Sequence, residues 1–139
     1  MQIEPYLFFN GRCEEALGFY ARALDGKITA LMRFEGAPTE DSQPLPPGWD
    51  QKVMHANFEA DGARFMASDG MPGTSSGSAF GGFSVSVNVP QDVERARQVF
   101  DALAAGGKVT MPFDKPFWGG HFGMLTDRFG LPWMVSCDV

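Results

Sequence analysis

The sequence predicts an α+β fold in which two tandem β-α-β-β-β modules share a single domain over residues 1–139. Module one is expected at about residues 1–70 and module two at about residues 80–139, with a Gly- and Ser-rich linker between them. Two observations predict the doubling. Both halves order their strand-like and helix-like segments in the same way, and "GKIT" at 26–29 returns as "GKVT" at 107–110.

Module one opens with an aromatic-rich strand over residues 3–9, after which the period becomes that of a helix. Between Cys13 and Leu24 apolar residues recur at the i, i+3, i+4 spacing of a helix with one buried stripe, and Asp25-Gly26 ends it. Three further segments have strand patterns, at residues 27–35, 52–60 and 63–69.

Residues 36–51, between the second and third strands, are too rich in Pro, Gly and acidic residues to form part of a sheet. The loop of about sixteen residues exceeds the usual length of a connection, so we expect it to be a lid, an arm or a dimer contact. The pair Asp61-Gly62 predicts a tight hairpin between the last two strands of the module.

Module two repeats this order. A strand is expected over residues 83–89, and an apolar face over residues 92–105 predicts a helix that ends at Gly106-Gly107. Three further strands are expected at residues 108–113, 121–126 and 131–136. The first half can be aligned on the second in three segments. A shift of 81 residues places "GKIT" on "GKVT". In the later strands a shift of 66 residues places His55 on His121, and a shift of 68 places "FMAS" on "WMVS".

Composition limits the partners. The net charge of −6 and the pI of about 4.7 leave no basic stripe for phosphates, so no nucleic acid is expected. No apolar run reaches the roughly 18 residues of a membrane helix, and the N-terminus lacks the features of a signal peptide. We therefore expect no membrane partner and a cytoplasmic location, in which Cys13 and Cys137 are free thiols.

Three stretches carry a resemblance to a known family: "PYLFFNGRCEEALGFY", "VMHANFEADGARFMASD" and "FWGGHFGMLTDRFGLPWMVS". They resemble the PhnB-like branch of the vicinal-oxygen-chelate superfamily (glyoxalase, bleomycin-resistance protein and dioxygenase), a branch often labelled demethylubiquinone methyltransferase-like. The resemblance implies curved mixed sheets that form a cup, helices on the convex side, a pocket between the modules and a homodimer. Methyl transfer is not expected, because the glycine-rich turn after a strand that such α/β enzymes use is missing.

Enzymes of this superfamily hold a divalent ion with His and Glu side chains from the first and last strand of each module. Matched onto this sequence, those positions fall on or beside Pro5, near Met66, near Phe83 or Ser84, and on Met134. None of these is a ligand for a hard divalent cation. We therefore expect no metal and no other cofactor.

Strand alternation indicates which side chains line the cup. Met54, Ala56, Phe58 and Ala60 should lie under the helices, and the residues between them should face the pocket or solvent. In module two the repeat gives His121 the place of His55. The candidate ligand-binding residues are His55, Asn57, Glu59, Met66, Trp118, His121 and Met134, and no catalytic residue is assigned.

Each candidate also has a structural interpretation. The histidines are either half-exposed strand residues or acid–base groups, and His55 and Glu59, roughly 13 Å apart along one strand, cannot touch directly. Trp118 either forms an aromatic rim or packs against the fold. Asp127 is expected to cap a turn, and Asp69 to be solvated or turn-capping.

The favoured function is binding of a small apolar or aromatic molecule. Two alternatives remain open. One is a metal-dependent lyase, isomerase or dioxygenase that holds a divalent ion with a relocated set, His55, Glu59 and His121. The other is a structural or interaction module whose own side chains fill the cup.

Overall fold

The computed structural model describes residues 1–36, 45–70 and 80–139, and the chain divides into two compact units, Met1–Ser78 and Ala79–Val139. Residues 37–44 of the expected loop, and residues 71–79 of the expected linker, lie outside the described part. The described end of the loop contains a short 3-10 helix, Trp49–Gln51.

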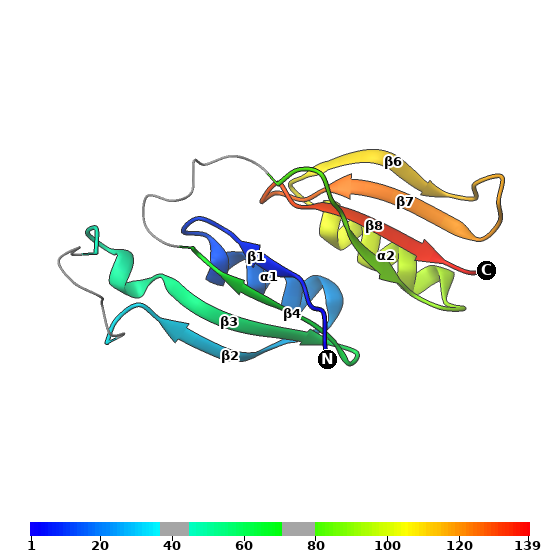
Figure 1. The fold of residues 1–139 in the computed structure, drawn as a ribbon. Helices are drawn as coiled ribbons and strands as arrows, with labels where there is room; N and C mark the ends of the chain where they lie inside the picture. The colour runs from blue at the N-terminus through cyan, green and yellow to red at the C-terminus, as the bar shows by residue number, and fades with distance from the viewer. Residues whose placement is uncertain (37–44, 71–79) are drawn as a thin grey trace. The chain divides into compact units, whose positions relative to one another are not determined.

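The first unit is a four-stranded sheet with one helix (Figure 1). Its elements are β1 (Tyr6–Phe8), α1 (Cys13–Leu24), β2 (Lys27–Arg33), β3 (Val53–Ala60) and β4 (Ala63–Ser68). The strand order is β1-β4-β3-β2, in which β1 is parallel to β4 and the other pairs are antiparallel. Asp61 and Gly62 form the hairpin turn between β3 and β4, both with positive φ, as the sequence predicts.

One stripe of α1 is buried against this sheet. The stripe consists of Cys13, Ala16, Leu17, Phe19 and Tyr20. The Tyr20 ring meets Phe58 on β3 and Phe65 on β4 edge to face, with centroids 6.5 and 6.3 Å apart, and those two phenylalanines stack on each other at 4.9 Å.

The second unit has the same architecture. Its elements are β5 (Val85–Asn88), α2 (Val93–Ala104), β6 (Lys108–Asp114), β7 (His121–Thr126) and β8 (Pro132–Cys137). The strand order β5-β8-β7-β6, with β5 parallel to β8, repeats that of the first unit. The predicted fold of two β-α-β-β-β modules is therefore confirmed.

The glycine that begins each copy of the repeated tetrapeptide has a packing reason. A Cβ on Gly26 would lie 2.8 Å from the carbonyl oxygen of Glu59 and 2.6 Å from the Phe58 ring. A Cβ on Gly107 would clash with the carbonyl oxygen of Thr126 and approach the Asp127 Cα to 2.8 Å. In both units the chain leaving the helix passes directly against the third strand of its sheet, where only glycine fits.

Strand pairing corrects one part of the predicted repeat. Asn57 pairs with Met66 in the first unit, and Met124 pairs with Met134 in the second. If Met66 matches Met134, Asn57 matches Met124, and the residue two positions earlier, His55, matches Phe122. The predicted equivalence of His55 and His121 is therefore wrong by one residue. Because successive side chains of a strand point to opposite faces, His55 and His121 lie on opposite faces of their sheets.

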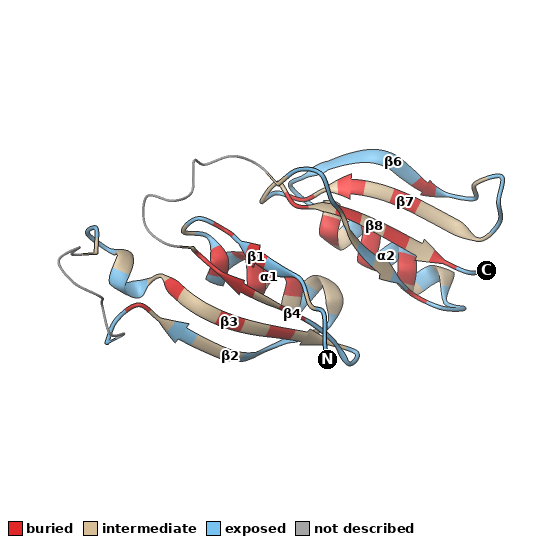
Figure 2. Cartoon of the chain, in the orientation of Figure 1, coloured by how far each residue is buried: buried red, intermediate tan, exposed pale blue. Residues whose placement is uncertain are grey.

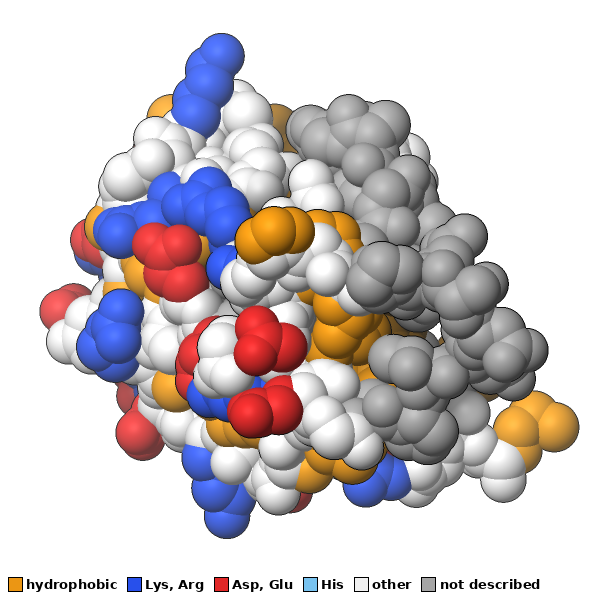
Figure 3. Space-filling view, turned by 90° about the vertical axis from the view of Figure 1, so that its left-hand side faces the viewer, with side chains coloured by type: hydrophobic (Ala, Val, Ile, Leu, Met, Phe, Trp, Pro, Cys, Tyr) orange, Lys and Arg blue, Asp and Glu red, His pale blue; other side chains and the backbone are white. Residues whose placement is uncertain are grey.

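Charged side chains of both signs are interspersed over the surface seen in Figure 3. One pair joins α1 to β2: the Arg33 guanidinium donates to both Glu14 carboxylate oxygens, at 3.1 and 2.8 Å. This hydrogen bond holds the pKa of Glu14 below its ordinary value. Neither helix in the described ranges has the length and apolar character needed to cross a membrane.

Candidate functional site

Each sheet has a helix-covered face that is buried and an opposite face that is half-exposed (Figure 2). On β3 the buried residues are Val53, Ala56 and Phe58, so the expected alternation holds over residues 56–59. Met54 and Ala60 were also expected under the helices, but both are half-buried. The pairing of β2 with β3 shifts between Met32 and Arg33, beside the Met54 end of the strand.

A chain of hydrogen bonds crosses the helix-free face of the first sheet. The Tyr6 hydroxyl lies 3.1 Å from His55 Nδ1, and His55 Nε2 lies 2.9 Å from Asn57 Oδ1. Because β4 lies between β1 and β3, the Tyr6 side chain reaches over β4 to the histidine. Two of the predicted site residues are thus joined, and the third member, Tyr6, was not predicted.

The other two candidates in this unit lie on the same face. Met66, which is half-buried, pairs with Tyr6 on one side and Asn57 on the other. Glu59 lies at the far end of the face, in a row with Lys27 of β2 and Arg64 of β4. The row of Glu59 is polar, whereas that of Met66 combines apolar and hydrogen-bonding groups.

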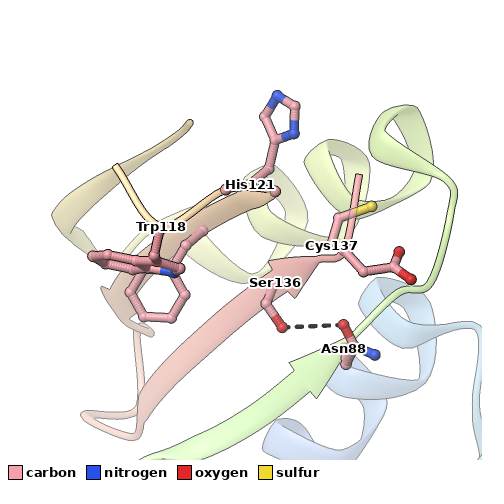
Figure 4. Close-up of a pocket in the computed structure, with 9 residues that line it drawn as sticks. Asn88, Trp118, His121, Ser136 and Cys137 are labelled. Atoms are coloured by element: carbon pink, nitrogen blue, oxygen red, sulfur yellow. Dashed lines mark hydrogen bonds between the residues drawn. The ribbon is translucent and has the colours of Figure 1, made fainter. Parts of the chain in front are cut away.

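The helix-free face of the second sheet carries a cavity of about 340 Å³ beside the turn between β6 and β7 (Figure 4). The Trp118 ring, 59% exposed, meets the Phe122 ring edge to face with centroids 5.8 Å apart. On the other side, the Ser136 hydroxyl lies 3.2 Å from Asn88 Oδ1. Met134 is on this face too, paired with Ser86 and Met124.

His121 borders this cavity, but the strand register directs its imidazole to the face of the sheet opposite that of Phe122. Its ring stacks on Phe113 at 5.6 Å and 19°, and Phe113 in turn meets Phe100 of α2. Its Nδ1 lies 2.6 Å from the Val139 carbonyl oxygen. In Figure 4 the imidazole points away from Ser136 and Asn88.

Strand pairing shows which residues lie beside the two methionines that the resemblance matched to metal ligands. Tyr6 lies beside Met66, and Ser86 lies beside Met134. These four side chains are a phenol, a hydroxyl and two thioethers, and none of them is a preferred ligand for a hard divalent cation. Within the described ranges, no three His, Cys, Asp or Glu side chains are grouped to hold a metal ion.

Two buried aspartates have structural roles. Asp127 Oδ1 accepts hydrogen bonds from the amides of Phe129 and Leu131, which confirms the predicted turn cap, and Oδ2 accepts one from the Trp133 indole at 2.8 Å. Asp69 was expected to be solvated or turn-capping, but it is 1% exposed. Its carboxylate accepts bonds from the amides of Gly11, Cys13 and Val53, each at 2.8 Å.

Cys13 and Cys137 are free thiols, as predicted, and both are buried. Burial raises the pKa of Cys13, and the nearby Asp69 carboxylate raises it further. A thiol held protonated in this way is a poor nucleophile and a poor metal ligand, so Cys13 does not contribute to the site.

Three residues that shape the open faces were missed: Tyr6, Asn88 and Phe122. Tyr6 stands directly after Pro5, the position that was compared with the superfamily's ligands. Its partner His55 lies 49 residues away in sequence, so only a correct pairing of β1 with β4 and of β4 with β3 would have found it.

Comparison with known proteins shows the family of the chain. A family model described as 3-demethylubiquinone-9 3-methyltransferase matches residues 1–136. Protein YjdN of Escherichia coli is 35% identical and covers 98% of this chain and 95% of its own. The crystal structure of protein PA1353 from Pseudomonas aeruginosa has 43% identity and a TM-score of 0.82, and it covers 99% of this chain and 98% of its own.

A putative 3-demethylubiquinone-9 3-methyltransferase, PhnB protein, from Bacillus cereus has 27% identity and a TM-score of 0.73, with 99% of both chains covered. A glyoxylase/bleomycin resistance protein/dioxygenase domain from Frankia is only 15% identical, but shares the fold with a TM-score of 0.68 over 100% of this chain and 98% of its own.

The paired modules and the open sheet faces place the protein in the glyoxalase/bleomycin-resistance fold class. Within that class, the chain belongs to the PhnB-like family described as 3-demethylubiquinone-9 3-methyltransferase.

Proposed function

We propose that this protein binds a small apolar or aromatic molecule, in the cytoplasm and as a homodimer, without catalysis at the superfamily's usual metal centre. One observation carries the proposal: the helix-free face of each sheet exposes large apolar side chains next to a few hydrogen-bonding groups. In the first unit these are Tyr6, Phe8 and Met32, which are 37%, 56% and 49% exposed, and in the second they include Met111 and Trp118.

A ligand site of this kind combines mostly apolar lining with a small number of placed polar groups. The methionines suit such a site because their unbranched side chains adapt to differently shaped guests. The polar groups of the two faces, His55 with Asn57 and Asn88 with Ser136, would orient the guest. Exposed apolar side chains on one face of a sheet are otherwise unfavourable in water.

A fluorescent hydrophobic probe, anilinonaphthalene sulfonate, tests the proposal with variants that differ only in the face they alter. Met32 pairs with His55 on the open face of β2, whereas Ile28 pairs with the buried Phe58 on the helix side. In β6, Met111 pairs with Met124 on the open face and Val109 with the buried Leu125. The exposures within each pair are comparable, at 49% and 36%, and at 41% and 44%.

Substitution of Met32 or Met111 by Ala should weaken probe binding by about tenfold, because removing several buried methylene-sized groups costs on the order of 1.5 kcal/mol. Ile28→Ala and Val109→Ala should change it less than about twofold. Equal losses in both members of a pair would mean that the open faces are not the site. Absence of probe binding to the wild-type protein would favour an interaction module.

Metal analysis distinguishes the proposal from the enzyme alternative. A stoichiometric divalent ion in the purified protein that disappears in His55→Ala would contradict binding without a metal. Sedimentation analysis checks the homodimer: a single species of twice the 15.2 kDa chain mass is expected.

A further inference from the structure

The hydrogen bonds among Tyr6, His55 and Asn57 have a fixed direction. The Asn57 side-chain carbonyl oxygen accepts from His55 Nε2 at 2.9 Å, so Nε2 carries the proton. In the neutral imidazole Nδ1 is then an acceptor, and the Tyr6 hydroxyl, 3.1 Å away, must donate its proton to it. The assignment follows from the orientation of the Asn57 amide, whose oxygen, and not its NH₂ group, faces His55.

The Tyr6 oxygen is left as an acceptor on the open face. Its single proton is directed to His55, while its lone pairs have no donor among the residues that the structure describes. The hydroxyl is also accessible, because the Tyr6 side chain is 37% exposed. Apolar surface surrounds it: the Phe8 ring stacks on the Tyr6 ring at 5.0 Å and 27°, and Met66 lies in the neighbouring strand position.

We infer that the Tyr6 oxygen receives a hydrogen bond from an acidic hydroxyl, a phenol or enol, on a flat ring that rests on Phe8 and Met66. The inference rests on the proposed function and narrows it to a class of ligand. A ring that ends in a hydroxyl meets both requirements of the face, apolar contact and donation to an unpaired acceptor. A ring that ends in a methyl ether meets only the first, because an ether oxygen has no proton to donate.

Naphthol and its methyl ether provide the test, since they share the ring and differ in the donor. Their dissociation constants are measured by fluorescence titration in neutral buffer. Naphthol should bind about two- to tenfold more tightly than the ether, the value of one net hydrogen bond.

Tyr6→Phe should abolish this preference and leave the affinity for the ether unchanged. Thr110→Ala, which removes an exposed hydroxyl from β6 of the second unit, should preserve it and is the control. Equal binding of naphthol and ether by the wild-type protein would overturn this inference while supporting the proposed function. No binding of either compound would overturn both.

Discussion

Asp69 allows the most direct test of how the first unit is held together. This buried carboxylate at the end of β4 accepts hydrogen bonds from the amides of Gly11 and Cys13 at the start of α1, and from the amide of Val53 at the start of β3. Asp69→Ala leaves all three donors without a partner. Asp69→Asn keeps one oxygen for Gly11 and Cys13 but turns an NH₂ group toward the Val53 amide.

The size of the effect follows from the burial of the donors. The bonds from Cys13 and Val53 are buried, whereas that from Gly11 is partly open to water, which can replace the lost acceptor. Each buried unsatisfied donor costs about 1–3 kcal/mol, so Asp69→Ala should lower the free energy of unfolding by about 2–6 kcal/mol. Asp69→Asn, which loses one buried bond, should lower it by about 1–3 kcal/mol.

Urea denaturation followed by circular dichroism measures these differences. Asp92 provides the control, because its exposed carboxylate caps α2 through a single bond, from the Arg95 amide at 2.9 Å. Asparagine caps helices about as well as aspartate, so Asp92→Asn should change stability by less than about 0.5 kcal/mol. The reasoning would be refuted if Asp69→Ala were no more destabilising than Asp92→Asn.

Three further predictions concern separate features. Cys13 should resist iodoacetamide at about pH 8 in the native protein and react once it is unfolded, because burial raises its pKa; mass spectrometry measures the modification. The lowered pKa of Glu14 means that its bond to Arg33 stabilises the fold above the ordinary carboxyl range and less as the pH falls, so the stability difference between wild type and Arg33→Gln should shrink in acid denaturation curves. Gly107→Ala, which forces a Cβ against backbone, should destabilise by about 1–3 kcal/mol in urea, whereas Gly81→Ala, in open space, should be within about 0.5 kcal/mol of wild type.

Much of the fold could be predicted because its signals are local. The helix over Cys13–Leu24 follows from apolar spacing alone, and its observed bounds are the predicted ones. The strands differ from prediction mainly at their ends: β1 begins at Tyr6 instead of residue 3, since pairing with β4 covers only three residues. The repeat in the sequence predicted the architecture, because the order of helices and strands in one unit predicts the order in the other.

The candidate site was harder to predict because it depends on pairing between distant strands. His55 and His121 look equivalent in sequence, yet β7 is offset by one residue, which directs His121 toward Phe113 on the helix side. Likewise the contact between Tyr6 and His55 spans β4, and no spacing in the sequence reports it. Identical residue types in two copies of a repeat are therefore weaker evidence for equivalent positions than the strand register of the two sheets.

The two helices differ in when they can be completed during synthesis. α2 is preceded by its own acceptor, Asp92, so one amide of its first turn has a protein partner as soon as the helix emerges. α1 begins after Arg12, whose side chain makes no such bond, and receives its acceptor from Asp69, 56 residues beyond Cys13. In a nascent chain the first amides of α1 therefore depend on water until the hairpin of β3 and β4 and Asp69 have left the ribosome.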